Sequence, residues 1–125
     1  MKNMKVLLLN GSPRKEGCTF TALSEVAKTL NHNGIDTEIF QAGNPDTDNV
    51  KAAAAKLKEA DALIVGSPVY WASPSGQNIE FMDKLCSMAG KDMLHKPAAA
   101  VASARRAGTT ATLDVLQKYF SYHEM

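Results

Sequence analysis

A short apolar run followed at once by a polar, glycine-containing segment constrains this chain more than any other feature. Residues 6–9 read Val-Leu-Leu-Leu, and residues 10–19 read Asn-Gly-Ser-Pro-Arg-Lys-Glu-Gly-Cys-Thr. A helical pattern begins near Phe20, so the predicted order is buried strand, loop and helix. The free N–H groups in the first turn of a helix, together with the helix dipole, favour an anion in such a loop. We therefore interpret residues 10–19 as a phosphate-binding loop.

The side chains of this loop suit a phosphate. Ser12 and Thr19 offer hydroxyl groups, and Arg14 offers a planar, charged fork of donors. Gly11 and Gly17 permit a tight turn, but five residues separate them where a Walker A loop has four, and the pattern G-x-G-x-x-G is absent. The alternative is an ordinary connection between a strand and a helix that binds nothing.

The composition indicates one globular domain over residues 1–125. Hydrophobic residues make up 45% of the chain and charged residues 22%, and the net charge of +1 gives no reason to expect nucleic acid or an anionic membrane as a partner. No apolar run approaches the roughly 20 residues that a membrane helix needs, and because residues 1–3 lead straight into the first strand we expect no signal peptide. Cys18 and Cys86 form no metal-spaced cluster, so we expect reduced thiols, no metal site and a cytoplasmic location.

The hydrophobic pattern alternates between strand and helix along the whole chain. Four strands are expected at residues 4–10, 35–41, 61–66 and 98–103, and four helices at residues 20–33, 49–60, 77–89 and 110–122. The continuous apolar run of the first strand indicates burial in a parallel sheet, whereas the alternation in residues 35–41 favours an edge strand. Gly34 is placed to end the first helix, and Ser75 to cap the third.

Three loops are expected at one edge of this sheet, because ligands of open parallel sheets bind beyond the carboxyl ends of the strands. The second of them, residues 67–76, carries Tyr70 and Trp71 between Pro68 and Pro74. Exposed aromatic side chains on a stiff loop suit stacking against a planar ring. The alternative for these two aromatics is a hydrophobic plug or an interface patch.

The third loop, residues 103–109, supplies Ser103, Arg105 and Arg106. Its guanidinium and N–H groups can stabilise an electron-rich ring or a second phosphate. A phosphate site at one end, aromatic walls at the other and donors along the edge indicate a phosphorylated aromatic cofactor. FMN fits better than a dinucleotide, because only one convincing phosphate loop is present.

The three segments together resemble known signatures. Residues 10–19, 66–76 (Gly-Ser-Pro-Val-Tyr-Trp-Ala-Ser-Pro-Ser-Gly) and 103–109 (Ser-Ala-Arg-Arg-Ala-Gly-Thr) are similar to those of the flavodoxin-like NAD(P)H-dependent FMN reductases. This family includes quinone reductases of the multimeric flavodoxin type and the flavin part of iron–sulfur flavoproteins. The resemblance implies a flavodoxin-like three-layer α/β sandwich, FMN as cofactor and NAD(P)H as cosubstrate. It also implies hydride transfer to a quinone, a free flavin or another small-molecule electron acceptor.

The resemblance also implies roles for individual residues. Ser12, Arg14, Cys18 and Thr19 would bind the FMN phosphate, with Phe20 near it; Pro68, Val69, Tyr70 and Trp71 would line the isoalloxazine and ribityl region; Ser103, Arg105 and Arg106 would border the ring. No catalytic side chain is expected, because the flavin ring carries the chemistry. Two interpretations of Cys18 stay open: a redox-active thiol at a helix N-terminus, or a small side chain whose backbone N–H meets the phosphate.

The chain departs from this family in two places. Residues 41–48 replace a longer, often Cys-rich insert of many relatives, so no iron–sulfur cluster is expected there. The family sheet has five strands in the order 2-1-3-4-5, whereas this chain ends just after its fourth helix. We therefore expect a parallel sheet of order 2-1-3-4 with the fifth strand missing, an open edge and an apolar patch on one face. Another subunit of a homodimer or higher oligomer would cover this surface; the alternative is a truncated chain of poor stability.

Two further functions stay open besides the reductase. The first is an FMN-binding electron carrier without a nicotinamide site, against which the net charge of +1 argues, because flavodoxins are usually strongly acidic. The second is a flavin-free scaffold.

Overall fold

The fold is a parallel sheet between two layers of helices. The computed structural model describes residues 3–125. The parallel strands are β1 (Lys5–Asn10), β2 (Asp36–Gln41), β3 (Ala62–Tyr70) and β5 (Ala98–Ser103), in the order β2-β1-β3-β5. The helices are α1 (Cys18–His32), α2 (Thr47–Glu59), α3 (Gly76–Ala89) and α4 (Thr109–Tyr122), with a 3₁₀ turn, η1 (Gly90–Asp92), after α3. Because β5 is the fourth predicted strand, the predicted order and the three-layer α/β class are confirmed.

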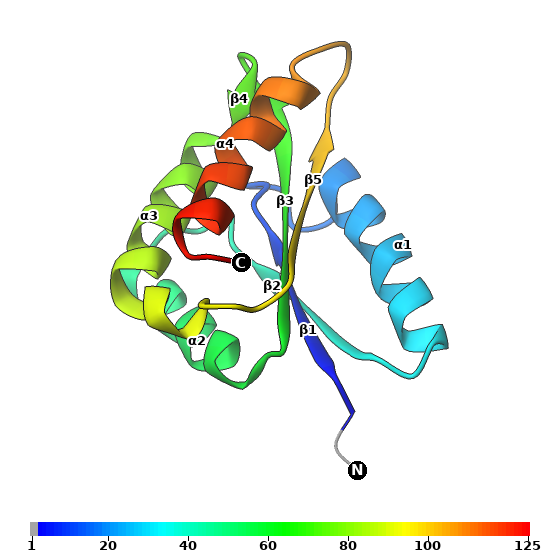
Figure 1. Cartoon of the computed structure of the whole chain (residues 1–125). Coiled ribbons are helices and arrows are strands. Elements are labelled where there is room, and N and C mark those ends of the chain that lie inside the picture. The colour runs from blue at the N-terminus through cyan, green and yellow to red at the C-terminus, as the bar shows by residue number, and fades with distance from the viewer. Residues whose placement is uncertain (1–2) are drawn as a thin grey trace.

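The central strand β1 is buried on both faces, which explains its continuous apolar run. Leu7 and Leu9 belong to a large core beneath α2, α3 and α4, whereas Val6 and Leu8 belong to a smaller core beneath α1. Figure 1 shows the corresponding layers, with α1 alone on one face of the sheet and the other three helices on the opposite face. β1 pairs with β2 on one side and with β3 on the other, so its carboxyl end lies in the middle of the sheet.

The third strand is longer than predicted. The sequence pattern predicts that it ends at residue 66 and that a loop covers residues 67–76. Instead β3 continues to Tyr70, turns at Trp71 and Ala72, and returns as the two-residue antiparallel strand β4 (Ser73–Pro74). The turn has φ angles of 53° and 58°, a conformation in which Asn or Gly is usual. Because the sequence has neither residue there, and Pro68 and Pro74 suggested a loop, the hairpin was missed.

The sheet therefore has five strands, but the additional one is this short hairpin partner. Within residues 3–125 no fifth parallel strand follows β5, and β5 is an edge of the sheet. The face of the sheet that carries α1 is covered by this helix only in part. There Ile64 and Val101 are half-buried and Ala99 is exposed. The expected apolar patch is thus made of alanine, valine and isoleucine side chains. The large exposed apolar residues of the described chain lie elsewhere: Met4, Tyr70, Trp71, Met88, Leu94 and Tyr122.

The helix ends follow the predicted signals. Gly34 has φ +79° just beyond the end of α1, and the Ser75 hydroxyl accepts a hydrogen bond from the Asn78 N–H at 3.1 Å at the start of α3. Each of the four helices begins one or two residues earlier than predicted. None of them, over the part of the chain that is described, is long and apolar enough to cross a membrane.

Candidate functional site

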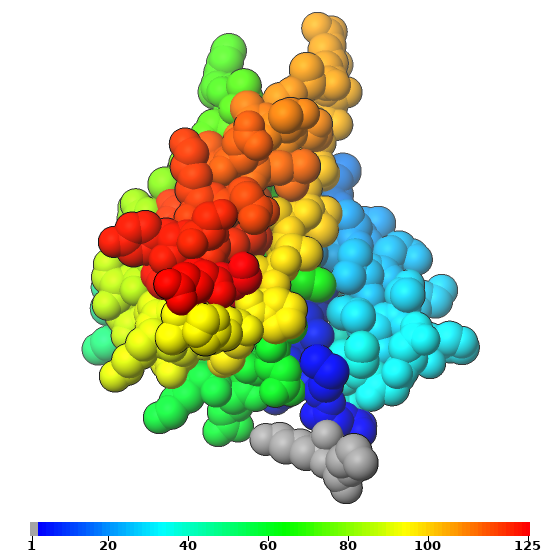
Figure 2. All heavy atoms as spheres, viewed as in Figure 1, coloured from blue at the N-terminus to red at the C-terminus, as the bar shows by residue number. Residues whose placement is uncertain are grey.

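The loop after β1, the end of β3 with its hairpin, and the segment after β5 meet at one end of the sheet. In Figure 2 the β3–β4 hairpin and the segment after β5 protrude from this same end of the molecule. A cavity of about 540 Å³ lies here, within the usual range of roughly 300–1,000 Å³ for small-molecule sites. Its lining consists of Ser12, Arg14, Cys18, Thr19, Pro68, Val69, Tyr70, Ser103, Ala104 and Arg105.

Nine of the twelve residues singled out in the sequence line this one cavity. The other three lie outside it. Trp71 stands fully exposed at the tip of the hairpin, Arg106 is exposed in the segment after β5, and the Phe20 side chain faces a shallow groove with Ala27 and Ile39. Thr19 lines the cavity and Phe20 does not, because consecutive residues of a helix point about 100° apart. Ala104 is the lining residue that the sequence analysis did not single out.

The phosphate-binding loop presents donors to the cavity, and no carboxylate lines it. α1 begins at Cys18 behind Gly17, and no side chain caps it, so the N–H groups of its first turn have no capping partner. The Ser12 side chain is nearly buried, and its Oγ accepts the Arg14 N–H at 3.1 Å. Arg14 and Arg105 are the charged residues of the lining. This donor set fits a phosphate, which favours a ligand site over an ordinary connection.

A hydrogen bond joins the phosphate-binding loop to the end of β5. The Thr19 and Ser103 hydroxyl oxygens lie 3.0 Å apart, and Thr19 is buried. Gly66 permits this close approach of α1 to the sheet, because a Cβ there would lie 3.0 Å from side-chain carbons of both Thr19 and Leu23. The first and third loops are therefore held at a fixed separation across the cavity.

Gly108 fixes the position of the hairpin segment that includes Val69, a lining residue of the cavity. Its φ is +96°, and a Cβ on it would lie 2.8 Å from Val69 Cγ1 and 2.9 Å from Ala72 Cα. The start of α4 therefore packs directly against the hairpin that carries Tyr70. The sequence shows only a glycine before a helix, so the contact with a segment about forty residues away could not be foreseen.

The two cysteines lie in different environments. Cys18 is exposed and lines the cavity, whereas Cys86 is half-buried on α3 with its Sγ 3.8 Å from Met93 Sδ. Burial, and to a lesser degree the nearby Asp83 carboxylate, raise the pKa of the Cys86 thiol from 9.0 to about 12. Cys86 therefore stays protonated at neutral pH, and Cys18 is the thiol that a ligand of the cavity would meet. Among the described residues no group of three or more His, Cys, Asp and Glu side chains is arranged to hold a metal ion.

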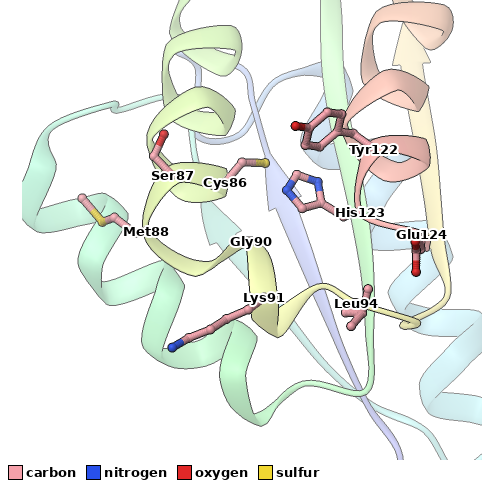
Figure 3. A pocket seen from close by; sticks show the side chains of 9 residues that line it. All are labelled: Cys86, Ser87, Met88, Gly90, Lys91, Leu94, Tyr122, His123 and Glu124. Carbon is pink, nitrogen blue, oxygen red and sulfur yellow. The ribbon is translucent and has the colours of Figure 1, made fainter.

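A second hollow of about 550 Å³ lies between the carboxyl-terminal ends of α3 and α4. Figure 3 shows Cys86, Tyr122 and His123 around it, with Lys91 and Glu124 further out. Helix C-termini repel anions, and Glu124 adds a carboxylate. This hollow is therefore a poorer phosphate site than the cavity at the other end of the sheet.

Comparison with known proteins identifies the family and the fold. The sequence pattern of the family described as NADPH-dependent FMN reductase matches residues 4–125. An iron–sulfur flavoprotein of Methanocaldococcus jannaschii is 31% identical over 98% of this chain and 74% of its own length. An NADPH azoreductase of Bacillus sp. (strain OY1-2) is 29% identical over 86% of this chain and 64% of its own length. A flavodoxin, WrbA-like protein from Agrobacterium tumefaciens has a TM-score of 0.76 and 21% identity over 98% of this chain and 74% of its own, which shows that the fold is flavodoxin-like.

Replacing Arg14 tests the phosphate assignment. Arg14→Ala is expected to weaken FMN binding about 10- to 100-fold, because a hydrogen bond to a charged group contributes roughly 1.5–3 kcal/mol. Quenching of flavin fluorescence during titration with the protein measures this. Lys15→Ala is the matched control, since Lys15 is exposed, has the same charge and does not line the cavity. A similar loss in both variants would contradict the assignment.

Proposed function

Because the chain belongs to the NADPH-dependent FMN reductase family, we propose that it transfers hydride from NAD(P)H to a small-molecule acceptor with FMN as its cofactor. The protein is an FMN-dependent oxidoreductase of flavodoxin-like fold. The observation that carries the finer proposal is one cavity that combines an uncapped helix N-terminus, two arginines and the aromatic ring of Tyr70. Proposed acceptors are planar conjugated molecules such as a quinone or a free flavin; one relative is an azoreductase by name.

The proposed cofactor contacts follow from the lining. Ser12, Arg14, Thr19 and the first-turn N–H groups of α1 would hold the FMN phosphate, with the Cys18 backbone among them. Residues 68–70 would line the isoalloxazine and ribityl region, and Ser103 and Arg105 would border the ring. FMN supplies the hydride and electron chemistry when bound, so the chain's residues serve to bind and orient it. This set omits the side chains of Phe20, Trp71 and Arg106, because they lie outside the cavity.

Arg105 has a proposed second effect. Arg105 lines the cavity together with its chain neighbours Ser103 and Ala104, and no carboxylate stands among the lining residues. A fixed positive charge beside an electron-rich ring favours the reduced, more negative form of that ring. We therefore infer that Arg105 assists the acceptance of hydride.

Reduction by NADPH alone tests the proposed activity. With FMN-loaded protein under anaerobic conditions, NADPH is expected to bleach the flavin absorption band without a second protein. FMN and NADPH mixed at the same concentrations without protein give the background rate. An FMN-loaded protein that bleaches no faster than this background would contradict the reductase proposal and favour an electron carrier that depends on a partner reductase.

We also propose that a second copy of the chain covers the edge of β5. This strand has parallel pairing on only its β3 side, and its side chains are half-buried except for the exposed Ala99. An open strand edge beside half-buried aliphatic side chains is a surface that soluble proteins usually cover.

Light scattering during size-exclusion chromatography measures the assembly directly. The expected mass is at least twice the 13.4 kDa of one chain, and it should not change on dilution across the micromolar range. A monodisperse monomer at these concentrations would contradict the proposed oligomer without affecting the proposal for the cavity.

A further inference from the structure

Two side-chain amides lie directly behind the phosphate-binding loop. Gln41, the last residue of β2, donates from Nε2 to the Ser12 carbonyl oxygen at 2.7 Å and accepts at Oε1 from Asn10 Nδ2 at 3.0 Å. The fully buried Asn10 accepts the Ser12 N–H at 3.1 Å, and its Nδ2 also donates to the Lys15 carbonyl at 3.1 Å. These bonds form a closed set between two amides and the backbone of residues 12–15. They hold the Ser12 N–H and the carbonyls of Ser12 and Lys15 through two side chains that do not line the cavity.

The connection between β2 and α2 is seated against the same loop. Gly43 is in such close contact that a Cβ on it would lie 1.9 Å from the Ser12 carbonyl oxygen. The fully buried Ala42 donates its N–H to the Asn10 carbonyl at 2.8 Å, which extends the pairing of β1 and β2 beyond the strands. Residues 41–48 are the segment that the sequence analysis identified in place of a longer insert. Here this short connection packs on the back of the phosphate-binding loop.

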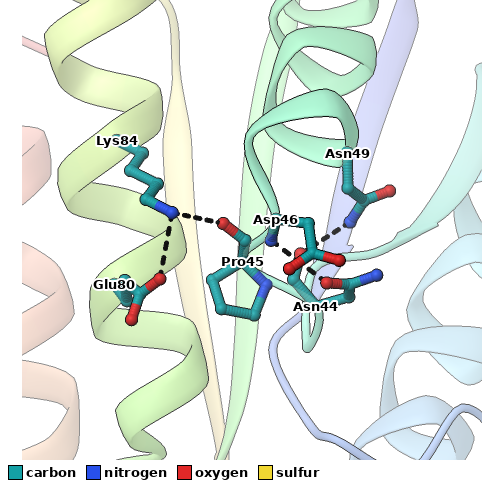
Figure 4. A network of polar contacts seen from close by, with 6 residues as sticks. All are labelled: Asn44, Pro45, Asp46, Asn49, Glu80 and Lys84. Atoms are coloured by element: carbon teal, nitrogen blue, oxygen red, sulfur yellow. Dashed lines mark hydrogen bonds and ion pairs between the residues drawn. The ribbon is translucent and has the colours of Figure 1, made fainter.

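Two helices hold that connection from the far side, as Figure 4 shows. Asn49, in α2, donates to the Asn44 carbonyl at 2.8 Å and also to the Gln41 carbonyl at 2.9 Å. Lys84, in α3, donates to the Pro45 carbonyl at 2.8 Å and pairs with Glu80 at 3.0 Å. Contacts therefore run without a break from α2 and α3, through the connection and Gln41, to the phosphate-binding loop.

We propose that Gln41 is a positioning residue for the cofactor phosphate. It does not line the cavity, so its effect passes through the Ser12 carbonyl, to which it donates, and through the Asn10 amide that it accepts from. A loop held in its binding conformation before the ligand arrives loses less conformational entropy on binding. The inference rests on the proposed function, since it takes residues 10–19 as the FMN phosphate site. It predicts an effect confined to ligands that carry a phosphate.

The test compares FMN with riboflavin, which has the same ring system but no phosphate. Gln41→Met keeps the side-chain length and removes both hydrogen bonds. We expect FMN affinity to fall about 5- to 30-fold, by loss of preorganisation, with riboflavin affinity unchanged within about twofold. Gln117→Met on α4 is the matched control, because Gln117 is exposed and remote from the loop, and it should change neither affinity.

Different outcomes test the phosphate site and the positioning role of Gln41 separately. A wild-type protein that binds FMN no more tightly than riboflavin would overturn the phosphate site and with it the proposed function. If the wild type prefers FMN, an unchanged preference in Gln41→Met, or an equal loss for both flavins, would overturn the positioning role alone. Should Gln41→Met fail to fold, as judged by circular dichroism, Asn49→Ala is tested in its place, because it removes the hydrogen bond from Asn49 to the Gln41 carbonyl. The same selective loss of FMN affinity is then expected, and its absence would overturn the proposal.

Discussion

The pairing of β1 on both sides, and its burial on both faces, is the constraint on which the rest of the molecule depends. Leu8 and Leu9 are fully buried, and β1 lies between β2 and β3. The chain leaves the sheet from the end of β1 at the point where the strand order reverses, which in open α/β sheets is where ligands bind. The loop after β1 is therefore placed at the centre of that end, with the loops after β3 and β5 beside it. The cavity follows from the topology, and the donor groups follow from the residues that the three loops carry.

Much of this arrangement could be predicted from the sequence, because its signals are local. The apolar run of residues 6–9, Gly34 and Ser75 each act within a few residues, and they predicted the strand, a helix end and a helix cap. The cavity lining was largely predictable too, since loops at the carboxyl ends of parallel strands converge whatever their detailed conformation. Trp71 shows where this reasoning ends. Trp71 directly follows Tyr70, which lines the cavity, but the turn between β3 and β4 places Trp71 outside it.

The parts that could not be predicted depend on contacts between distant segments. Gly108 is required by the hairpin that it touches, and Gln41 acts on a loop about thirty residues earlier. Gly108 lies in the third signature segment, but its contact with the hairpin cannot be read from that segment, and Gln41 belongs to none of the three segments. Each is explained only by an atom of another element. The phosphate-binding loop thus has two sides: hydroxyls, an arginine and helix N–H groups toward the cavity, and on the back the buried Asn10 amide and the half-buried Gln41 amide. The first side is readable from residue types, and the second only from the structure.

A crystal structure of the protein with bound FMN tests the central claim most directly, namely that the cavity between the loop after β1, the end of β3 and the end of β5 holds the cofactor. The account predicts the phosphate beside Ser12, Arg14 and the first turn of α1, with the isoalloxazine ring against residues 68–70 and Arg105. Flavin density in the hollow between α3 and α4, or a phosphate away from the N-terminus of α1, would contradict it.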